Sequence, residues 1–166
     1  MFRSEYRTAC PSDDKFHEEF VSASFTPSLI DRARYCLESI EISKHGRHNE
    51  LNVLGTEAVH VEHIMPQKIE TKKAKEEFGD WVTYLGEKAE LHHPNYLSRI
   101  GNLTLFAGKL NIGASNGPFA RKKAAYAESA ILMTQELATM SQFKFKQIEK
   151  RSRQLADLAV KLWPAP

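Results

Sequence analysis

The stretch that decides how this chain folds reads Val59-His60-Val61-Glu62-His63-Ile64-Met65-Pro66-Gln67. Its first six residues predict a β-strand, and Pro66 ends the strand because proline has no N–H for a ladder hydrogen bond. An acid and a histidine, Glu62 and His63, therefore stand side by side close to the point where the strand stops. A carboxylate and an imidazole in this position are a candidate pair for acid–base or metal chemistry.

Two later segments extend this unit. The run Ile100-Gly101-Asn102-Leu103-Thr104-Leu105-Phe106 predicts a second strand from 103 to 106, and residues 108–112, with Leu110-Asn111, predict a short helix. Asn102 then lies at the mouth of the second strand, where its side chain can hydrogen-bond across the intervening loop. We expect these pieces, from about 59 to 113, to form the core of the domain.

The composition is that of one ordinary globular domain. The chain has 166 residues, of which 42% are hydrophobic and 27% charged, and its net charge is +2. These values argue against a wholly disordered chain, and the weak positive charge permits nucleic-acid binding without arguing for it. No apolar run reaches membrane-spanning length and the first ten residues are too polar for a signal peptide, so we expect a cytoplasmic protein without a membrane partner. Cys10 and Cys36 lack the CxxC spacing of a zinc knuckle.

Helical periodicity dominates the rest of the chain, so the predicted fold class is α+β and mainly helical. Residues 1–25 are interpreted as a lead-in or linker from a missing N-terminal domain, and residues 26–166 as a single domain. The expected helices cover about 26–43, 71–85, 118–140 and 145–163, with a loop at 91–99. The last two helices are predicted to pack as an antiparallel pair over about 118–163.

Three of the polar residues form a minimal set for phosphodiester cleavage. A neutral imidazole can take a proton from water near neutral pH, which makes His63 the candidate base. A hard cation such as Mg²⁺, or Mn²⁺ in its place, neutralises charge at phosphorus and binds few protein oxygens beside water and substrate phosphate. Glu62 and Asn111 are the candidate metal ligands. Asn102 has the side chain needed to hold the base in place.

Strand geometry leaves one question open at this pair. On a regular strand, neighbouring side chains point to opposite faces, so Glu62 and His63 serve one phosphate only where the strand bends or ends. If the strand stays regular, His60 shares a face with Glu62 and becomes a competing metal ligand. Otherwise His60 is a supporting residue behind the ligands, or a plain strand residue.

Other polar residues allow further interpretations. His92 and His93 could join His60 and His63 in a zinc hydrolase site, although no HExxH spacing supports this. Lys122, with Arg121 and Lys123, lies one turn into the helix after the proposed site and could contact the scissile phosphate or simply be solvated. A non-catalytic DNA-binding or subunit-docking module that keeps a nuclease-like shell is the alternative function.

The order Glu-His-Ile-x-Pro, Gly-Asn-Leu-x-Leu and Leu-Asn, followed by Lys122, resembles the HNH (His-Me finger) nucleases with their ββα-metal core. More closely, the chain resembles the C-terminal nuclease half of GmrSD-type, modification-dependent restriction enzymes, and also the C-terminal half of SspE-like anti-phage nucleases. The similarity covers about residues 26–163. The residues that carry it beyond the core are Pro118, Phe119, Lys122, Tyr126, Ser129, Ile148, Arg151, Leu155 and Trp163.

The resemblance implies a metal-dependent endonuclease that nicks or cleaves foreign or modified DNA in restriction or anti-phage defence. In it His63 is the general base and Asn102 organises the loop. Glu62, where many HNH enzymes have aspartate, and Asn111 bind Mg²⁺. The structural zinc cysteines of some HNH enzymes are absent, so the insert 67–99 and the flanking helices must hold the fold by packing. The resemblance also implies DNA as partner and an N-terminal sensor or nucleotide-hydrolysing domain, or a separate subunit, absent from this chain.

Overall fold

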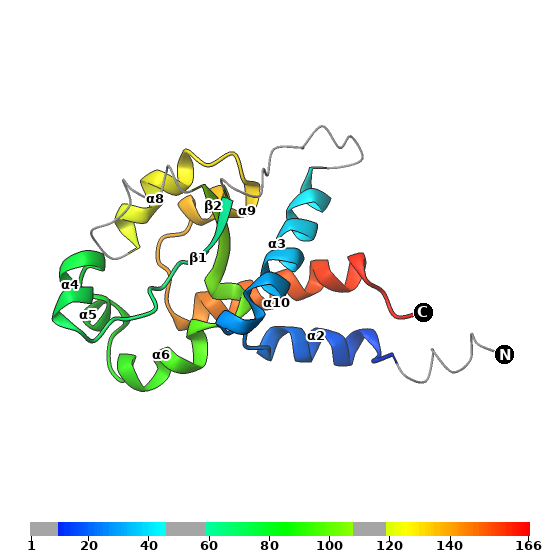
Figure 1. Ribbon diagram of the computed structural model, residues 1–166, viewed down its shortest axis with the longest axis horizontal. Coiled ribbons are helices and arrows are strands. Elements are labelled where there is room, and N and C mark those ends of the chain that lie inside the picture. Colours follow the sequence, from blue (N-terminus) through cyan, green and yellow to red (C-terminus); the bar gives the residue numbers. More distant parts are fainter. Residues whose placement is uncertain (1–9, 46–58, 108–118) are drawn as a thin grey trace.

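A two-stranded antiparallel sheet forms the centre of the molecule (Figure 1). The computed structural model describes residues 10–45, 59–107 and 119–166. Strand β1, Val59–His63, pairs with β2, Leu103–Ala107, so that Glu62 lies opposite Thr104 and His63 opposite Leu103. Both strands predicted from the sequence are therefore confirmed. The short helix expected at 108–112, with Asn111, lies outside the described residues.

Helices surround this sheet, which confirms the mainly helical α+β class (Figure 1). They are α2 (Asp13–Ser22), α3 (Ile30–Lys44), α4 (Lys72–Phe78), α5 (Trp81–Leu85), α6 (Ala89–Leu97), α8 (Ala120–Ala127), α9 (Leu132–Ala138) and α10 (Phe145–Leu162), with 3-10 turns η1 (Pro27–Leu29) and η2 (Ile100–Asn102). Within the described ranges, no helix has the length and apolar character needed to cross a membrane.

The two faces of the sheet belong to two different hydrophobic cores. Val59, Leu103 and Leu105 face the first core, which α2, α3 and α10 complete. Phe106, on the other face, belongs to the second core with residues of α5, α8 and α9. Alternation along a strand sends successive side chains to opposite faces, so β2 contributes to both cores, whereas Val59 and Val61 of β1 face the first core. The sheet thus joins two packed bodies, and the residues at its end lie between them.

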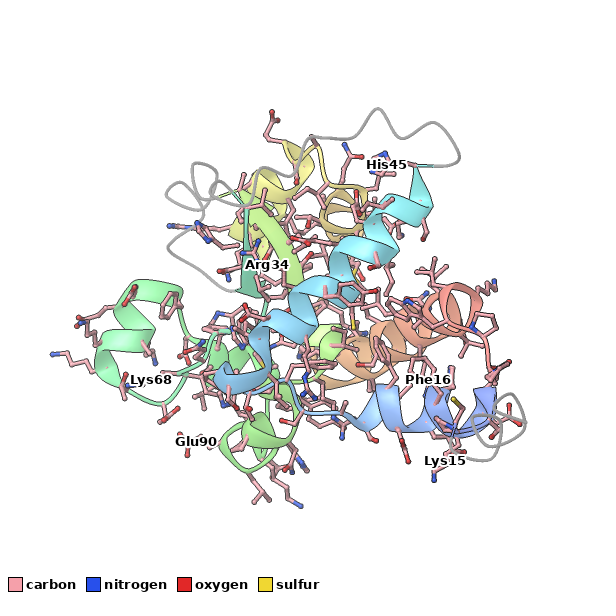
Figure 2. The ribbon with its side chains drawn as sticks, turned by 45° about the vertical axis from the view of Figure 1, so that its right-hand side comes forward. Lys15, Phe16, Arg34, His45, Lys68 and Glu90 are labelled. Carbon is pink, nitrogen blue, oxygen red and sulfur yellow. The ribbon has the colours of Figure 1, made fainter. Side chains whose placement is uncertain are left out.

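The N-terminal helix α2 packs along α10 and contributes to the first core. Phe20 and Val21 are buried there, and Phe25 follows them at the start of the connection to η1. The boundary expected at residue 26 therefore does not separate this helix from the rest of the packed body. Helix α3 is connected to β1 by a hydrogen bond, which the Arg34 guanidinium donates to the Val59 carbonyl oxygen at 2.8 Å (Figure 2).

The helix predicted from 71 to 85 is two helices in the structure. Gly79 ends α4 with a φ of 83°, a left-handed value that glycine adopts without steric cost. Asp80 then caps α5 because its carboxylate accepts a hydrogen bond from the Thr83 N–H at 3.1 Å. The apolar spacing persists across the break because Phe78 of α4 packs against the second core, which contains Trp81 and Leu85 of α5. Periodicity alone therefore did not reveal the break.

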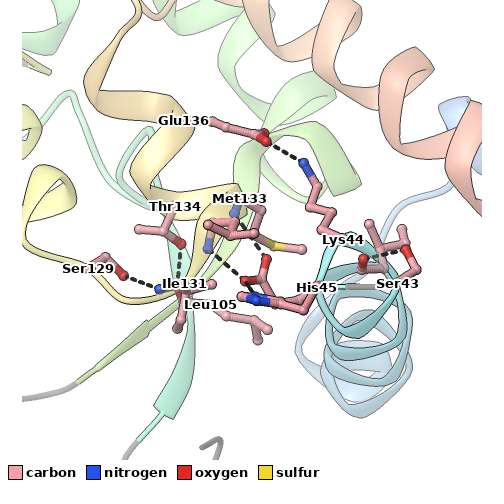
Figure 3. Close-up of polar contacts among 12 residues, drawn as sticks. Ser43, Lys44, His45, Leu105, Ser129, Ile131, Met133, Thr134 and Glu136 are labelled. Atoms are coloured by element: carbon pink, nitrogen blue, oxygen red, sulfur yellow. Dashed lines mark hydrogen bonds and ion pairs between the residues drawn. The ribbon is translucent and has the colours of Figure 1, made fainter. Parts of the chain in front are cut away.

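The helix predicted from 118 to 140 is also divided, into α8 and α9. The Ser129 hydroxyl accepts from the Ile131 N–H at 3.2 Å in the break, and Thr134 of α9 donates to the Leu105 carbonyl oxygen of β2 (Figure 3). The buried Glu41 carboxylate of α3 accepts from the first N–H groups of α9, those of Leu132 and Met133. A cap from a distant element starts the new helix here.

Two further expectations about the helices differ from the structure. Helix α10 packs along α2, α3 and η2, and the long partner helix of the expected antiparallel pair over 118–163 is not formed. The segment 91–99, expected to be a loop, is largely helix α6, which contains Pro94. Its buried His93 ring nitrogen Nε2 lies 2.7 Å from the Pro66 carbonyl oxygen, so this helix is fixed to the loop after β1.

Gly101 allows η2 to approach α10 closely. A Cβ at this position would lie 2.1 Å from the Ile148 carbonyl oxygen and 2.5 Å from the Ser152 hydroxyl oxygen. We expect Gly101→Ala to lower the free energy of unfolding by about 3 kcal/mol, because backbone atoms cannot move aside cheaply. Chemical denaturation measures the change.

Ser152→Ala is the matched control for this substitution. It removes only the hydrogen bond that the Ser152 hydroxyl accepts from the Gly101 N–H at 3.0 Å, and it should cost about 1 kcal/mol. If both variants lose the same small free energy of unfolding, the close approach of η2 to α10 does not exclude a side chain at position 101.

Candidate active site

A cavity of about 350 Å³ lies at the end of β1, and both Glu62 and His63 line it. The remaining lining comes from the loop after β1, from α4 and from Lys122 of α8. The lining residues are Glu62, His63, Pro66, Gln67, Lys68, Thr71, Lys73, Ala74, Glu77, Phe78 and Lys122. Among the described residues, His60 is not part of this lining, although it shares a strand face with Glu62.

The pair reaches one cavity because the strand stops at His63. The register is regular up to that residue, so Glu62 lies opposite Thr104 and His63 opposite Leu103 on the other face. His63 borders two hollows, the one that it shares with Glu62 and another near Val61 on the α3 side. His63 is the last residue of β1, so its ring lies at the end of the sheet and can border the cavity that Glu62 also lines.

Lys122 binds the acid of this pair. Its ammonium nitrogen lies 3.0 Å from Glu62 Oε1 and donates to the His63 carbonyl oxygen at 3.1 Å. The residue is only 5% exposed, so these two contacts replace most of the water that a free ammonium would bind. Its neighbours in sequence are more accessible, with Arg121 exposed and Lys123 half-buried. The contact to DNA expected of all three residues stays a prediction.

Tyr126 lies one helical turn after Lys122 and is buried under the same face of the sheet. Its ring packs edge-on against Phe106 at a centroid distance of 5.2 Å. Its hydroxyl has no hydrogen-bond partner among the residues that the structure describes. Burial and the nearby Glu62 carboxylate raise the pKa of this hydroxyl, so it stays protonated. The packing of Tyr126 fixes α8, and thereby Lys122, relative to β2.

The environment of His63 favours the neutral imidazole. Burial is the main cause that lowers the pKa of His63, and the positive charge of Lys122 and the nearby His93 act in the same direction. The Glu62 carboxylate opposes them by favouring the charged ring. The Gln67 side-chain amide lies 3.3 Å from Nδ1 and helps to orient the ring. An amide can present an N–H or a carbonyl oxygen, so this contact is compatible with either neutral tautomer.

Asn102 connects η2 to the loop after β1 and to the end of α6. Its Oδ1 accepts from the Met65 N–H at 2.8 Å, and its Nδ2 donates to the carbonyl oxygens of Met65 at 3.1 Å and Leu97 at 2.8 Å. The Asn102 backbone carbonyl oxygen also accepts from the Ile64 N–H at 2.9 Å. The side chain is fully buried, so these bonds form in a medium that makes them strong. They fix the two residues that directly follow His63.

The Asn102 turn is itself held by α10. The buried Arg151 guanidinium donates to the carbonyl oxygens of Gly101 at 3.0 Å and Leu103 at 2.6 Å. Burial lowers the pKa of Arg151 to about 10, which still leaves the group charged at neutral pH. The chain of contacts therefore runs from α10 through η2 and Asn102 to the loop that carries the site.

Sequence reasoning missed two lysines at the cavity. Lys68 and Lys73 line the same hollow as His63, the first from the loop before α4 and the second from α4 itself (Figure 2 labels Lys68). Both are exposed. The only signal in the sequence is the run of lysines after Pro66, and the same helix also holds Lys72 and Lys75, which are ion-paired with Glu76 and Asp80. The spacing of lysines along the sequence could not distinguish those that line the cavity from those that are ion-paired on α4.

The histidine cluster needed for a zinc hydrolase is not formed. No group of three histidine, cysteine or acidic side chains in the described ranges could hold a metal ion, and all four histidines of that hypothesis are described. His93 is buried against the Pro66 carbonyl oxygen, and the His92 ring packs edge-on against Phe145. Both residues serve the packing of α6.

One group at the cavity has the chemistry of a Mg²⁺ ligand. Mg²⁺ takes one or two protein carboxylate or amide oxygens and leaves its remaining positions to water and phosphate. Glu62 provides such a carboxylate at a cavity with room for water and phosphate oxygens. The second expected ligand, Asn111, lies outside the described residues.

Residues 10–158 match the family model described as GmrSD restriction endonucleases, C-terminal domain. Comparison with curated proteins and with solved structures gives no significant match. The family match starts before α2 and ends within α10, and it includes β1, β2 and every described residue of the site. The chain therefore belongs to the family of C-terminal domains of GmrSD restriction endonucleases.

Proposed function

We propose that this domain is a metal-dependent DNA endonuclease of the HNH type, which hydrolyses phosphodiester bonds in restriction or anti-phage defence. The observation that carries the proposal is the meeting of Glu62 and His63 at one cavity, beside three lysines that suit a phosphate backbone. Membership of a restriction endonuclease family makes DNA the expected substrate. An N-terminal sensor or nucleotide-hydrolysing part, in the same protein or as a separate subunit, is proposed to select that DNA.

His63 is the proposed general base. Its lowered pKa keeps the ring neutral near physiological pH, so it can accept a proton from the attacking water. Asn102 holds the loop that directly follows His63, and we propose that it keeps the ring at the edge of the cavity. When Mg²⁺ or Mn²⁺ is bound, it supplies charge neutralisation at the phosphoryl oxygens and at the leaving oxygen.

Glu62 and Asn111 are the proposed metal ligands. Glu62 lies at the cavity wall and is oriented there by Lys122 at 3.0 Å. Arg121 and Lys123 flank Lys122 at the start of α8, and we propose that they contact DNA phosphates beyond the cavity. His60 lies on the strand face of Glu62, but it is exposed and not on the cavity wall, which favours a plain strand residue over a metal ligand.

The alternative function is a DNA-binding or subunit-docking module without cleavage. The buried ion pair of Lys122 with Glu62 is compatible with it, since such a pair can be purely structural. Incubation of supercoiled plasmid with Mg²⁺ or Mn²⁺, with and without chelator, separates the two functions. Retention of plasmid without metal-dependent nicking or linearisation favours the module, and metal-dependent cleavage favours the nuclease.

The first test of the mechanism replaces the base. We expect His63→Ala to slow cleavage by roughly 10²–10⁴-fold, because water then loses its proton acceptor. Single-turnover cleavage of plasmid in Mg²⁺ measures the effect, and thermal unfolding shows that the fold is retained.

The matched control for that variant is His60→Ala on the same strand. This exposed residue lies outside the cavity wall, so the rate should stay within about threefold of the unmodified protein. Unchanged cleavage by His63→Ala together with a large loss in His60→Ala would show that His63 is not the base.

The second test is the pH dependence of the single-turnover rate. A base works in its neutral form, so the rate falls when the pH drops through the pKa of His63. Burial lowers that pKa from its usual value of about 6.5, so the acidic limb of the profile lies below pH 6.5. Rates measured from about pH 5 to about pH 8 define this limb. An acidic limb centred above pH 6.5 would contradict the neutral, buried state of the ring.

The third test concerns Asn102. Asn102→Asp keeps the acceptor for the Met65 N–H but turns a carboxylate oxygen toward the carbonyl oxygens of Met65 and Leu97. We expect a loss of about 3 kcal/mol in the free energy of unfolding together with slower cleavage. Asn95→Asp, an exposed position on α6, is the control and should change stability by less than about 0.5 kcal/mol. Equal stability of the two variants would show that the buried amide does not hold the loop.

A further inference from the structure

The cavity at the end of β1 has more positive than negative side chains on its described wall. Lys68, Lys73 and Lys122 are set against two carboxylates, those of Glu62 and Glu77. A preformed site for a free divalent cation has the opposite balance, because carboxylates must offset the charge of the ion. The described wall is therefore better suited to receive a phosphate than a cation alone.

Lys122 acts on Glu62 directly. Its ammonium lies 3.0 Å from Glu62 Oε1, and its second contact, to the His63 carbonyl oxygen at 3.1 Å, holds it in that position. The stacked Phe119–Phe143 pair and the Phe106–Tyr126 contact fix the start and the end of α8. The ammonium is thus a built-in part of the site, whereas Lys68 and Lys73 are exposed and can move.

We propose that Lys122 makes retention of the divalent ion depend on bound nucleic-acid phosphate. This inference rests on the proposed nuclease function. The Lys122 ammonium neutralises Glu62, so a divalent ion that reaches the free protein meets a carboxylate whose charge is already balanced. A phosphate in the cavity would add the missing negative charge, so that Glu62 would retain the ion only while that phosphate is bound.

Burial makes this effect large enough to matter. A charge in contact with a carboxylate at the protein surface is screened by water, but Lys122 is 5% exposed and its field acts through protein atoms. The repulsion between an ammonium and a divalent ion that share one carboxylate therefore persists at physiological salt. Lys68 and Lys73, at the same wall, provide the first contacts for the incoming phosphate.

The consequence is an ordered assembly of the site. Phosphate binding comes first or together with the metal, and metal without DNA stays weakly bound. The domain therefore does not retain its metal when no DNA occupies the cavity, and the metal-loaded site forms only on bound DNA. Lys122 is in this respect a positioning and regulating residue that acts through Glu62, and its role differs from that of Arg121 and Lys123.

The experiment measures Mn²⁺ binding by electron paramagnetic resonance, in the presence and absence of a saturating short DNA duplex. All proteins carry His63→Ala so that the duplex is not cleaved. We expect the duplex to lower the Mn²⁺ dissociation constant about tenfold in the parent protein. In Lys122→Met, the protein without DNA should bind Mn²⁺ about tenfold more tightly than the parent, and the effect of the duplex should shrink to less than about threefold.

Two further variants separate charge from structure. Lys122→Gln keeps an N–H donor at the helix position without the charge, and it should tighten Mn²⁺ binding as Lys122→Met does. Lys72→Met removes an exposed charge of α4 that is absent from the cavity wall, and Mn²⁺ binding without DNA should be unchanged. A merely structural Lys122 would weaken Mn²⁺ binding when replaced, because Glu62 would lose its anchor.

Two results would overturn the inference. The first is Mn²⁺ binding that is equal with and without DNA in the parent protein. The second is unchanged or weaker Mn²⁺ binding without DNA in both Lys122→Met and Lys122→Gln. Either result together with metal-dependent plasmid cleavage by the unmodified protein leaves the nuclease function intact. Absence of cleavage with either metal contradicts the proposed function instead.

Discussion

The hydrogen bonds of one buried amide hold the site of this domain together. Asn102 contacts the backbone of Met65 on both its N–H and its carbonyl oxygen, and it also reaches the Leu97 carbonyl oxygen. An amide side chain is the smallest group that offers an acceptor and two donors in one plane, so it can replace a stretch of backbone pairing where β1 has ended. The loop that follows His63 is fixed in this way without a disulfide or a structural metal in the described part of the chain.

Buried charges form the second layer of this support, and each is paired with groups of opposite polarity. Arg151 donates to carbonyl oxygens of η2 and β2, and Glu41 accepts from the first N–H groups of α9. Lys122 binds Glu62 and the His63 carbonyl oxygen at the cavity. Burial of a charge costs several kcal/mol per ion unless such partners replace its water. Helices α8 and α10 are therefore connected to the sheet, and α3 to α9, by charged groups that would be costly to leave unpaired.

The sequence predicted the elements that depend on local chemistry. The alternation before Pro66 and the run after Asn102 gave both strands, and the apolar stripe from Phe145 gave the long last helix. The prediction failed where helices meet breaks whose cause is distant. The break between α8 and α9 is stabilised by Glu41, about ninety residues earlier in the chain, and apolar spacing continues across it. The sequence around Pro94 and its two histidines predicts a loop, but this segment forms helix α6. The contact of His93 with the Pro66 carbonyl oxygen, from a distant part of the chain, fixes that helix.

The sequence by itself determined which chemical groups are present and that Glu62 and His63 stand at the end of a strand before a proline. It also carried the family resemblance, because motif order and residue type are linear properties of the chain. Only the tertiary structure decided which groups share the cavity with this pair: Lys122 sixty residues later as a buried counter-ion, and Lys68 and Lys73 among several similar lysines. The physical reason is that charge balance and burial depend on distances between elements far apart in the chain. Those distances follow from how the two cores pack against the sheet, and no spacing along the sequence encodes them.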